Sequence, residues 1–283
     1  MNKVSSSSAW MVGVVLLLFI SGPSKILAHD QTNVIRFGVY PYESARSLYA
    51  LYATAAKRIE EKTGKKVELV SAPDQIAFIE KGKQGAYDLA LVSPNCFFTI
   101  QPVGYRVIAR GEPSFHGGTI VRSDSPITAP EQLRGKKIAA LGKFSYGGYL
   151  YFRQELAEMG ISPDKDVEFS FLDKVDSVIL SVLNRKYDAG VIRLDTLENP
   201  AFSAVRDQVR IISRSQEIPQ FPFVVKTSMD QNTVDQIRGV LTAITPGNAE
   251  DKGILKSLQI ERILAAQDAD YEAFRQVLEK SKK

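Results

Sequence analysis

The stretch L-G-K-F-S-Y-G-G-Y-L, residues 141–150, joins a predicted strand to a predicted helix. Just before the turn, residues 137–141 (K-I-A-A-L) form a short apolar run that predicts a buried strand. After the turn, apolar side chains recur at helical spacing and predict a helix over residues 149–159; these are Leu150, Phe152, Leu156 and Met159. The stretch therefore predicts a strand–turn–helix unit, the repeating unit of an α/β fold.

The same turn predicts a seat for an anion. The first backbone N–H groups of a helix have no partner inside the helix, and the helix dipole makes this end positive. Ser145 can cap the helix or donate to a bound oxygen, while Gly147 and Gly148 let a ligand approach the backbone closely. The alternative is an ordinary capped helix start that binds nothing.

The composition is that of a soluble globular protein, with 44% hydrophobic and 24% charged residues among 283. Removing residues 1–28 takes away Lys3 and Lys25 and no acidic residue, so the formal charge falls from +4 to +2. Such a charge does not indicate a polyanion, and no nucleic-acid partner is expected. The single cysteine, Cys96, excludes an internal disulfide.

The N-terminal residues predict export. A basic start precedes an uncharged apolar run over residues 9–20, which the sequence Ser21-Gly22-Pro23 breaks. This run is short for a membrane span and has the length of a secretory signal, with Ala28 at a cleavage point. Residues 1–28 are therefore predicted to be a signal peptide, and an uncleaved anchor is the alternative.

Strands and helices alternate along the rest of the chain, in two series. The first series predicts strands at 34–39, 67–70, 88–92, 105–109 and 118–121, with helices at 45–62 and 73–83. The pattern restarts after Pro126 and Pro130, with strands at 137–141, 167–171, 188–192 and 209–212 and helices at 149–159 and 176–184. Residues 220–225 then cross back, and residues 232–244 and 259–280 are predicted to be helical. Ligands of parallel, helix-covered sheets bind beyond the carboxyl ends of the strands, where loops 40–44, 93–96 and 142–148 fall.

Seven segments in order resemble the phosphonate-type family of periplasmic solute-binding proteins. They are R-F-G-V-Y-P-Y-E-S (36–44), A-P-D-Q (72–75), Y-D-L-A-L (87–91), T-I-V-R-S-D-S-P-I (119–127), S-Y-G-G-Y-L (145–150), S-V-L-N-R-K-Y-D-A (181–189) and I-P-Q-F-P-F-V (218–224). The resemblance implies an α/β fold of periplasmic binding protein type II, in which two α/β lobes are joined by a two-segment hinge and close on the ligand. Lobe one would be residues 33–118 plus 221–283 and lobe two residues 119–220, with crossings at Gly117-Gly118 and at residues 219–222.

The resemblance also implies a function in the periplasm. The protein would close around a small oxyanion of the phosphonate, phosphite or phosphate class and present it to an ABC permease or a membrane sensor kinase, without a cofactor. The family's S-T-S-G motif reads Ser145-Tyr146-Gly147-Gly148 here, and a tyrosine before the first crossing is Phe115, with His116 beside it. These departures weaken phosphonate itself as the ligand and leave a smaller or differently shaped oxyanion open. The family's acidic residue after a second-lobe strand is retained as Asp195.

Cys96 has two interpretations. It follows the carboxyl end of a predicted strand, and cysteine is among the most buried residue types, so it can be a core residue. Alternatively it faces the cleft and binds a thiophilic solute as a thiolate, with His116 as helper. The resemblance supports this alternative, because sensor-associated members of the family that bind arsenite rely on a cysteine.

An enzyme is the competing class. A serine hydrolase needs a G-x-S-x-G turn, but Lys143 stands two residues before Ser145, and no cluster has metal-ligand spacing. A purely structural exported protein would have no use for unpaired amides. The sequence therefore predicts a binding protein rather than an enzyme. Its candidate ligand-binding residues are Tyr40, Ser93, Cys96, His116, Ser145, Tyr146, Gly147, Gly148 and Asp195.

Overall fold

The computed structural model describes residues 33–198 and 200–280. The predicted signal peptide, residues 1–28, lies outside these residues. All elements discussed below belong to one compact unit, Val34–Lys283. Among the described residues, no helix has the length and apolar character that crossing a membrane requires.

The first sheet has six strands in the order β11-β4-β10-β3-β1-β2. Their bounds are β1 (Val34–Val39), β2 (Lys66–Val70), β3 (Leu89–Leu91), β4 (Tyr105–Glu112), β10 (Pro222–Lys226) and β11 (Arg262–Ala265). Strand β1 pairs in parallel with β2 and β3, whereas β10 runs antiparallel to β3 and β4. The sheet is therefore assembled from both ends of the described chain.

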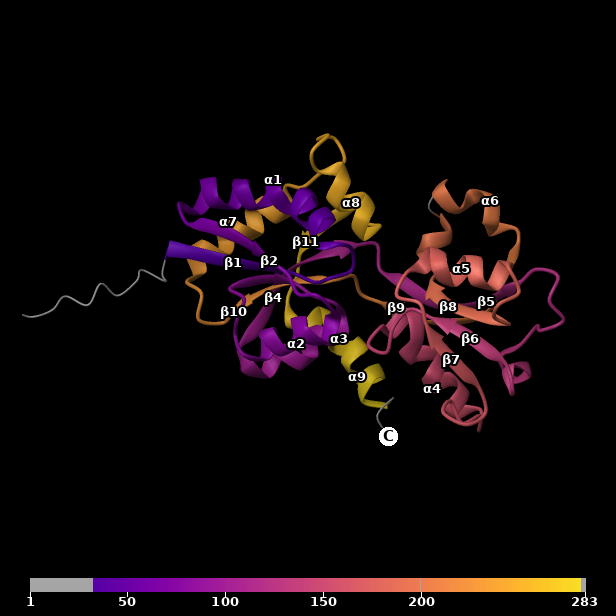
Figure 1. The fold of residues 1–283 in the computed structure, drawn as a ribbon. Helices are drawn as coiled ribbons and strands as arrows, with labels where there is room; N and C mark the ends of the chain where they lie inside the picture. The colour runs from indigo at the N-terminus through magenta and orange to yellow at the C-terminus, as the bar shows by residue number, and fades with distance from the viewer. Residues whose placement is uncertain (1–32, 199, 281–283) are drawn as a thin grey trace, which may run out of the picture. The chain divides into compact units, whose positions relative to one another are not determined.

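Helices cover both faces of this sheet (Figure 1). Their bounds are α1 (Ala45–Thr63), α2 (Gln75–Lys83), α3 (Pro94–Ile100), α7 (Gln231–Thr242) and α8 (Lys252–Leu258). The last described helix, α9 (Glu272–Lys280), instead places Phe274 in the buried cluster of the second sheet. Helices α1, α7 and α8 pack on one face, where Tyr52 and Ile237 join a buried apolar cluster. Helices α2 and α3 pack on the other face around Phe78 and Phe97. The apolar spacing predicted for α1 is buried as expected, at Leu48, Tyr52, Ala55, Ala56 and Ile59.

The second sheet has five strands in the order β7-β6-β8-β5-β9. Its elements are β5 (Phe115–Arg122), β6 (Lys137–Ala140), α4 (Tyr151–Glu158), β7 (Glu168–Phe171), α5 (Val175–Leu183), β8 (Ala189–Arg193), α6 (Ser203–Arg206) and β9 (Val209–Ile218). Helix α4 buries Phe152 and Leu156 against one face, and α5 buries Val178 and Ile179 against the other (Figure 1). This sheet therefore has its own core on each side.

The first crossing between the sheets is not where the sequence predicted it. The chain leaves the first sheet after β4 and enters the second at β5, so the change falls at Pro113-Ser114. Gly117 and Gly118 lie inside β5 and pair with Arg193 and Ile192 of β8. They are glycines because neighbours crowd them: a Cβ on Gly117 would lie 2.5 Å from the carbonyl oxygen of Gly147. The second crossing, between β9 and β10, falls within the predicted residues 219–222.

The C-terminal part of the chain also differs from the prediction. Residues 259–280 were expected to be helical, but residues 262–265 form β11 at the edge of the first sheet and α9 begins only at Glu272. A four-residue apolar run fits a strand as well as a helical turn, and tertiary pairing decides between them. Residues 220–225, expected only to cross back, contain most of β10.

Candidate functional site

Tyr40 and Ser93 come together at the carboxyl ends of the neighbouring strands β1 and β3. The Tyr40 N–H donates to the Leu91 carbonyl at 3.0 Å, and the Ser93 side chain is near enough to lower the pKa of the Tyr40 phenol against the effect of burial. The Tyr40 ring packs edge-on against Phe78 and Phe221, with centroids 5.5 and 5.8 Å away. This burial raises the pKa of Tyr40 well above that of a free phenol. At neutral pH, Tyr40 and Ser93 are therefore uncharged hydroxyls.

Cys96 lies in the core beneath this loop. Its side chain is 1% exposed, in the cluster that α2 and α3 make with the first sheet. Burial raises the pKa of the thiol to about 12, so it stays protonated at neutral pH. The expectation that Cys96 faces a cleft is wrong, because the side chain turns inward in the first turn of α3 and its backbone N–H donates to the Ser93 hydroxyl at 3.4 Å. The thiolate alternative is accordingly not favoured.

Ser145 caps the helix start that the sequence singled out. Its hydroxyl oxygen accepts from the Gly148 N–H at 3.1 Å, and a single π turn, Tyr146–Leu150, leads into α4. Within the described residues, no acceptor is found for the N–H groups of Tyr146 and Gly147. The predicted anion seat therefore keeps two backbone donors, and the third, that of Gly148, is used by the cap.

The glycines of this turn are needed for packing inside the protein. A Cβ on Gly147 would lie 3.1 Å from the Phe115 ring and 3.2 Å from Ile218. A Cβ on Gly148 would meet Leu141 at 2.5 Å. Close approach of a ligand, which the sequence suggested as the reason for both glycines, is therefore not required to explain them.

Tyr146 is buried under the C-terminal helix. Its ring makes an edge-to-face contact with Phe274 of α9, with the centroids 4.7 Å apart. Burial raises the pKa of Tyr146 to about 12. The phenol is therefore neutral at neutral pH. Its contact with Phe274 packs α9 against the core of the second sheet.

Arg193 lies beside the candidate residue Asp195 but was not among the candidate residues. It ends β8, and its guanidinium forms an ion pair with the candidate residue Asp195, with 3.1 Å between Nε and Oδ1. The guanidinium carbon lies 3.9 Å from the centre of the Phe115 ring. The position alone could have indicated it, since Arg193 follows a buried strand in the same way as the predicted loops do.

His116 is not joined to the other candidate residues by any contact found in the described part of the chain. Its Nδ1 lies 3.0 Å from the Ser215 carbonyl oxygen on the adjacent strand β9. The neighbouring Gly117 N–H donates to the Ser215 hydroxyl at 2.9 Å. Ser215 therefore fixes this part of β5, which leaves a ligand-binding role for His116 as a prediction only.

Asn95 connects the two candidate loops. Its side-chain amide donates to the carbonyl oxygen of Phe144, 2.5 Å away, so the first turn of α3 contacts the turn before Ser145. Asn95 belongs to a loop that the sequence predicted to lie at the site, although it was not among the candidate residues. Hydroxyls from the first sheet and free amides from the second therefore belong to loops that are bonded to each other.

The comparison with known families identifies this arrangement. The family described as "ABC transporter, phosphonate, periplasmic substrate-binding protein" matches residues 37–271. The chain belongs to this family. The phosphate-import protein PhnD of Mycolicibacterium smegmatis is 24% identical over 283 residues, which cover 90% of this chain and 88% of the relative. The phosphonates-binding periplasmic protein of Escherichia coli is 25% identical over 269 residues, which cover 88% of this chain and 77% of the relative.

A solved structure of the phosphonate-binding family supports the fold. PhnD1 of Prochlorococcus marinus, in complex with methylphosphonate, matches with a TM-score of 0.76 at 16% identity, covering 89% of this chain and 99% of that one. The predicted type II fold with two α/β lobes is confirmed, and so is the prediction of a periplasmic solute-binding protein.

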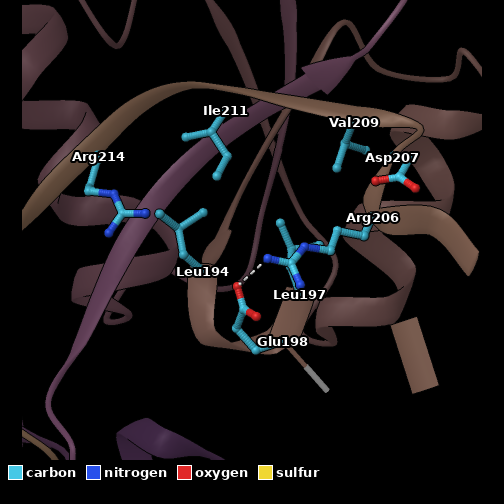
Figure 2. Close-up of a pocket in the computed structure, with 8 residues that line it drawn as sticks. All are labelled: Leu194, Leu197, Glu198, Arg206, Asp207, Val209, Ile211 and Arg214. Atoms are coloured by element: carbon cyan, nitrogen blue, oxygen red, sulfur yellow. Dashed lines mark hydrogen bonds and ion pairs between the residues drawn. The ribbon is translucent and has the colours of Figure 1, made fainter. Parts of the chain in front are cut away.

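Two hollows are lined by none of the candidate residues. One, of about 480 Å³, is on the second sheet and is lined by Leu194, Leu197, Glu198, Arg206, Asp207, Val209, Ile211 and Arg214 (Figure 2). Arg206 points at Glu198 across it, with 2.9 Å between Nη2 and Oε1. The other, of about 700 Å³, lies between α1 and α8. In residues 33–198 and 200–280, no group of three or more His, Cys, Asp or Glu side chains is arranged to hold a metal.

Proposed function

We propose that this member of the phosphonate-binding family binds a small oxyanion of the phosphonate–phosphate class in the periplasm and delivers it to an ABC permease. The observation that carries the proposal is the pair of free amides, Tyr146 N–H and Gly147 N–H, at a positive helix start. Uncharged hydroxyls of Tyr40 and Ser93 on the neighbouring loop add donors without adding a repelling charge. Donors of this kind suit the oxygens of a tetrahedral anion.

The relatives support the ligand class. Their names give phosphate, phosphonates and methylphosphonate, and each of these anions presents several phosphorus-bound oxygens. The binding cycle needs no covalent step. The two sheets are joined through residues 113–114 and 219–221, and a ligand that contacts both loops stabilises the closed arrangement that a permease recognises.

Thermal unfolding tests the proposal. The chain without residues 1–28 is heated with phosphate, phosphite, methylphosphonate, 2-aminoethylphosphonate or sulfate. A ligand present at about 100 times its dissociation constant adds roughly 2.7 kcal/mol to the free energy of unfolding, which raises Tm by several degrees. Calorimetric titration then gives the dissociation constant. The proposal fails if none of the phosphorus oxyanions raises Tm more than sodium chloride of equal ionic strength.

Export and the absence of turnover are part of the same proposal. The full-length chain, expressed in a Gram-negative host, is expected in the periplasmic fraction with His29 as its first residue. The ligand recovered after binding is expected to be chemically unchanged by phosphorus NMR, because the candidate residues include no nucleophile activated by a base. A new phosphorus resonance that grows with time would indicate an enzyme.

A further inference from the structure

The guanidinium of Arg193 has donors that the protein does not use. Its Nε and Nη2 bind the Asp195 carboxylate, and Nη2 also lies 3.5 Å from Oε1 of Gln220. No partner is found for Nη1 within the described residues. The side chain is 18% exposed, so a ligand can reach it from solvent.

Gln220 supplies a second unused donor in the second crossing. The residue is 1% exposed, and its Nε2 has no hydrogen-bond partner among the described residues. Its backbone is held in place, because the Tyr271 hydroxyl donates to the Gln220 carbonyl at 2.6 Å. A buried N–H group without a partner is energetically unfavourable, and a bound acceptor oxygen would supply the partner.

The pair of Arg193 and Gln220 lies beside the helix start described above. The guanidinium carbon of Arg193 lies 3.9 Å from the centre of the Phe115 ring, and a Cβ on Gly147 would lie 3.1 Å from an atom of the same ring. The positive charge of Arg193 also reaches Tyr42, where it opposes the burial that raises the pKa of this phenol to about 12. Tyr42 belongs to the loop after β1 that the sequence placed at the site. Arg193 therefore lies among the candidate loops.

We propose that Arg193 and Gln220 jointly bind an oxygen atom of the anionic ligand, and that Asp195 positions Arg193 for this contact. This inference rests on the proposed function and names the groups that recognise the ligand. Both free groups are donors, so the ligand presents an acceptor oxygen to them. Asp195 is already neutralised by Arg193, so it has no free charge to offer a ligand ammonium group. The site therefore selects simple phosphorus oxyanions over aminoalkylphosphonates.

The test is calorimetric titration of the mature chain with methylphosphonate. Arg193→Lys keeps the charge but loses the planar N–H donors of the guanidinium, and we expect it to raise the dissociation constant about fivefold. Arg193→Gln loses both the charge and the guanidinium, and we expect a rise of about tenfold or more. Gln220→Leu is expected to raise the dissociation constant about threefold or more. Arg214→Gln is the matched control: Arg214 is exposed on β9, no side-chain partner is found for it in the described chain, and its loss is expected to change the dissociation constant less than about twofold.

The ligand-free Tm separates recognition from a structural role. Gln220→Leu removes an unpaired buried donor, so its ligand-free Tm is expected to equal or exceed that of the wild type. If Gln220 had only a structural role, Gln220→Leu would instead lower the ligand-free Tm and leave the dissociation constant unchanged.

The inference is overturned if wild type binds methylphosphonate and both Gln220→Leu and Arg193→Lys bind it equally well. It is also overturned if 2-aminoethylphosphonate binds wild type more than about tenfold tighter than methylphosphonate, since Asp195 would then be recognising an ammonium. In both cases the proposed function survives. If wild type binds no phosphorus oxyanion, the proposed function fails, and the inference fails with it.

Discussion

At the scale of single residues, burial decides the chemistry of Cys96. The thiol pKa of about 12 comes from desolvation. A reactive cysteine needs a positive, partly exposed environment, and this residue is 1% exposed. The position of Cys96 in the sequence, after a strand and before a helix, is the same for a ligand and for a core residue. Only the direction of its side chain separates the two.

The first prediction follows from this burial. In native buffer at pH 8, Cys96 is expected to react with a disulfide reagent such as Ellman's reagent at least about 100-fold more slowly than in 6 M guanidinium, because the thiolate is the reacting form. The absorbance of the released thiol gives both rates. Unfolded chain at the same pH serves as the reference. Labelling at the unfolded rate in native buffer would show that the thiol is accessible.

At the scale of elements, strongly periodic segments and most short buried strands were predictable, and the short strand β11 was not. Strand β1, at residues 34–39, and the apolar face of α1 match the sequence pattern, because their periodicity is unambiguous. Strand β11 was missed, because its short apolar run has no period of its own and depends on pairing with β4. Gly117 and Gly118 were taken for a flexible crossing, although close packing against residues distant in sequence is what requires them.

The candidate site follows the same rule. Loop positions came from the strand ends, so the loops of Tyr40, Ser93 and Ser145 could be predicted. The side-chain contacts of Gln220 and Asn95 could not be predicted, because residues distant in sequence supply the partners. The partner of Gln220 is Arg193, and that of Asn95 is the Phe144 carbonyl.

The second prediction concerns the contact of β5 with the turn before α4. Gly117→Ala places a Cβ 2.5 Å from a backbone oxygen, which cannot move aside cheaply, and is expected to lower the free energy of unfolding by about 1–3 kcal/mol. Gly239→Ala is the matched control, since Gly239 is exposed in the middle of α7 with no atom near its added Cβ. The control is expected to stabilise the protein by about 0.5–1 kcal/mol.

Urea unfolding of both variants gives these free energies from the midpoint and the slope. Both variants replace a glycine by alanine, but the expected changes in the free energy of unfolding have opposite signs, so the difference reports on the surroundings of each glycine. If Gly117→Ala stabilised the protein as well, the close approach of β5 to the turn would be contradicted.

At the scale of the whole molecule, buried acidic protons are spread over both sheets. Burial raises the pKa of Tyr42 and Tyr146 to about 12 from an ordinary value of 10.0, and that of Cys96 to about 12 from 9.0. In the unfolded chain these groups ionise near their ordinary values. Between pH 9 and about 12 the folded protein therefore binds more protons than the unfolded chain, so its stability falls as pH rises.

The third prediction concerns the dependence of Tm on pH. The titration of these groups is expected to leave Tm unchanged between pH 7 and 8.5 and to lower it steadily above pH 9.5. Differential scanning calorimetry at several pH values measures it. Tyr146→Phe removes one of the titrating groups, so its Tm is expected to fall less steeply than that of the wild type. An unchanged Tm up to pH 11 would mean that the phenols and the thiol are not desolvated as described.

The edge-to-face contact of Tyr146 with Phe274 has a consequence for attempts to exchange specificity between relatives. Residues 142–150 look like a self-contained cassette, but their second aromatic rests on a helix encoded more than a hundred positions later. A chimera that exchanges residues 142–150 alone would place a foreign residue 146 against the native Phe274. An exchange of specificity should therefore replace α9 together with the turn, so that the two contacting segments come from the same relative.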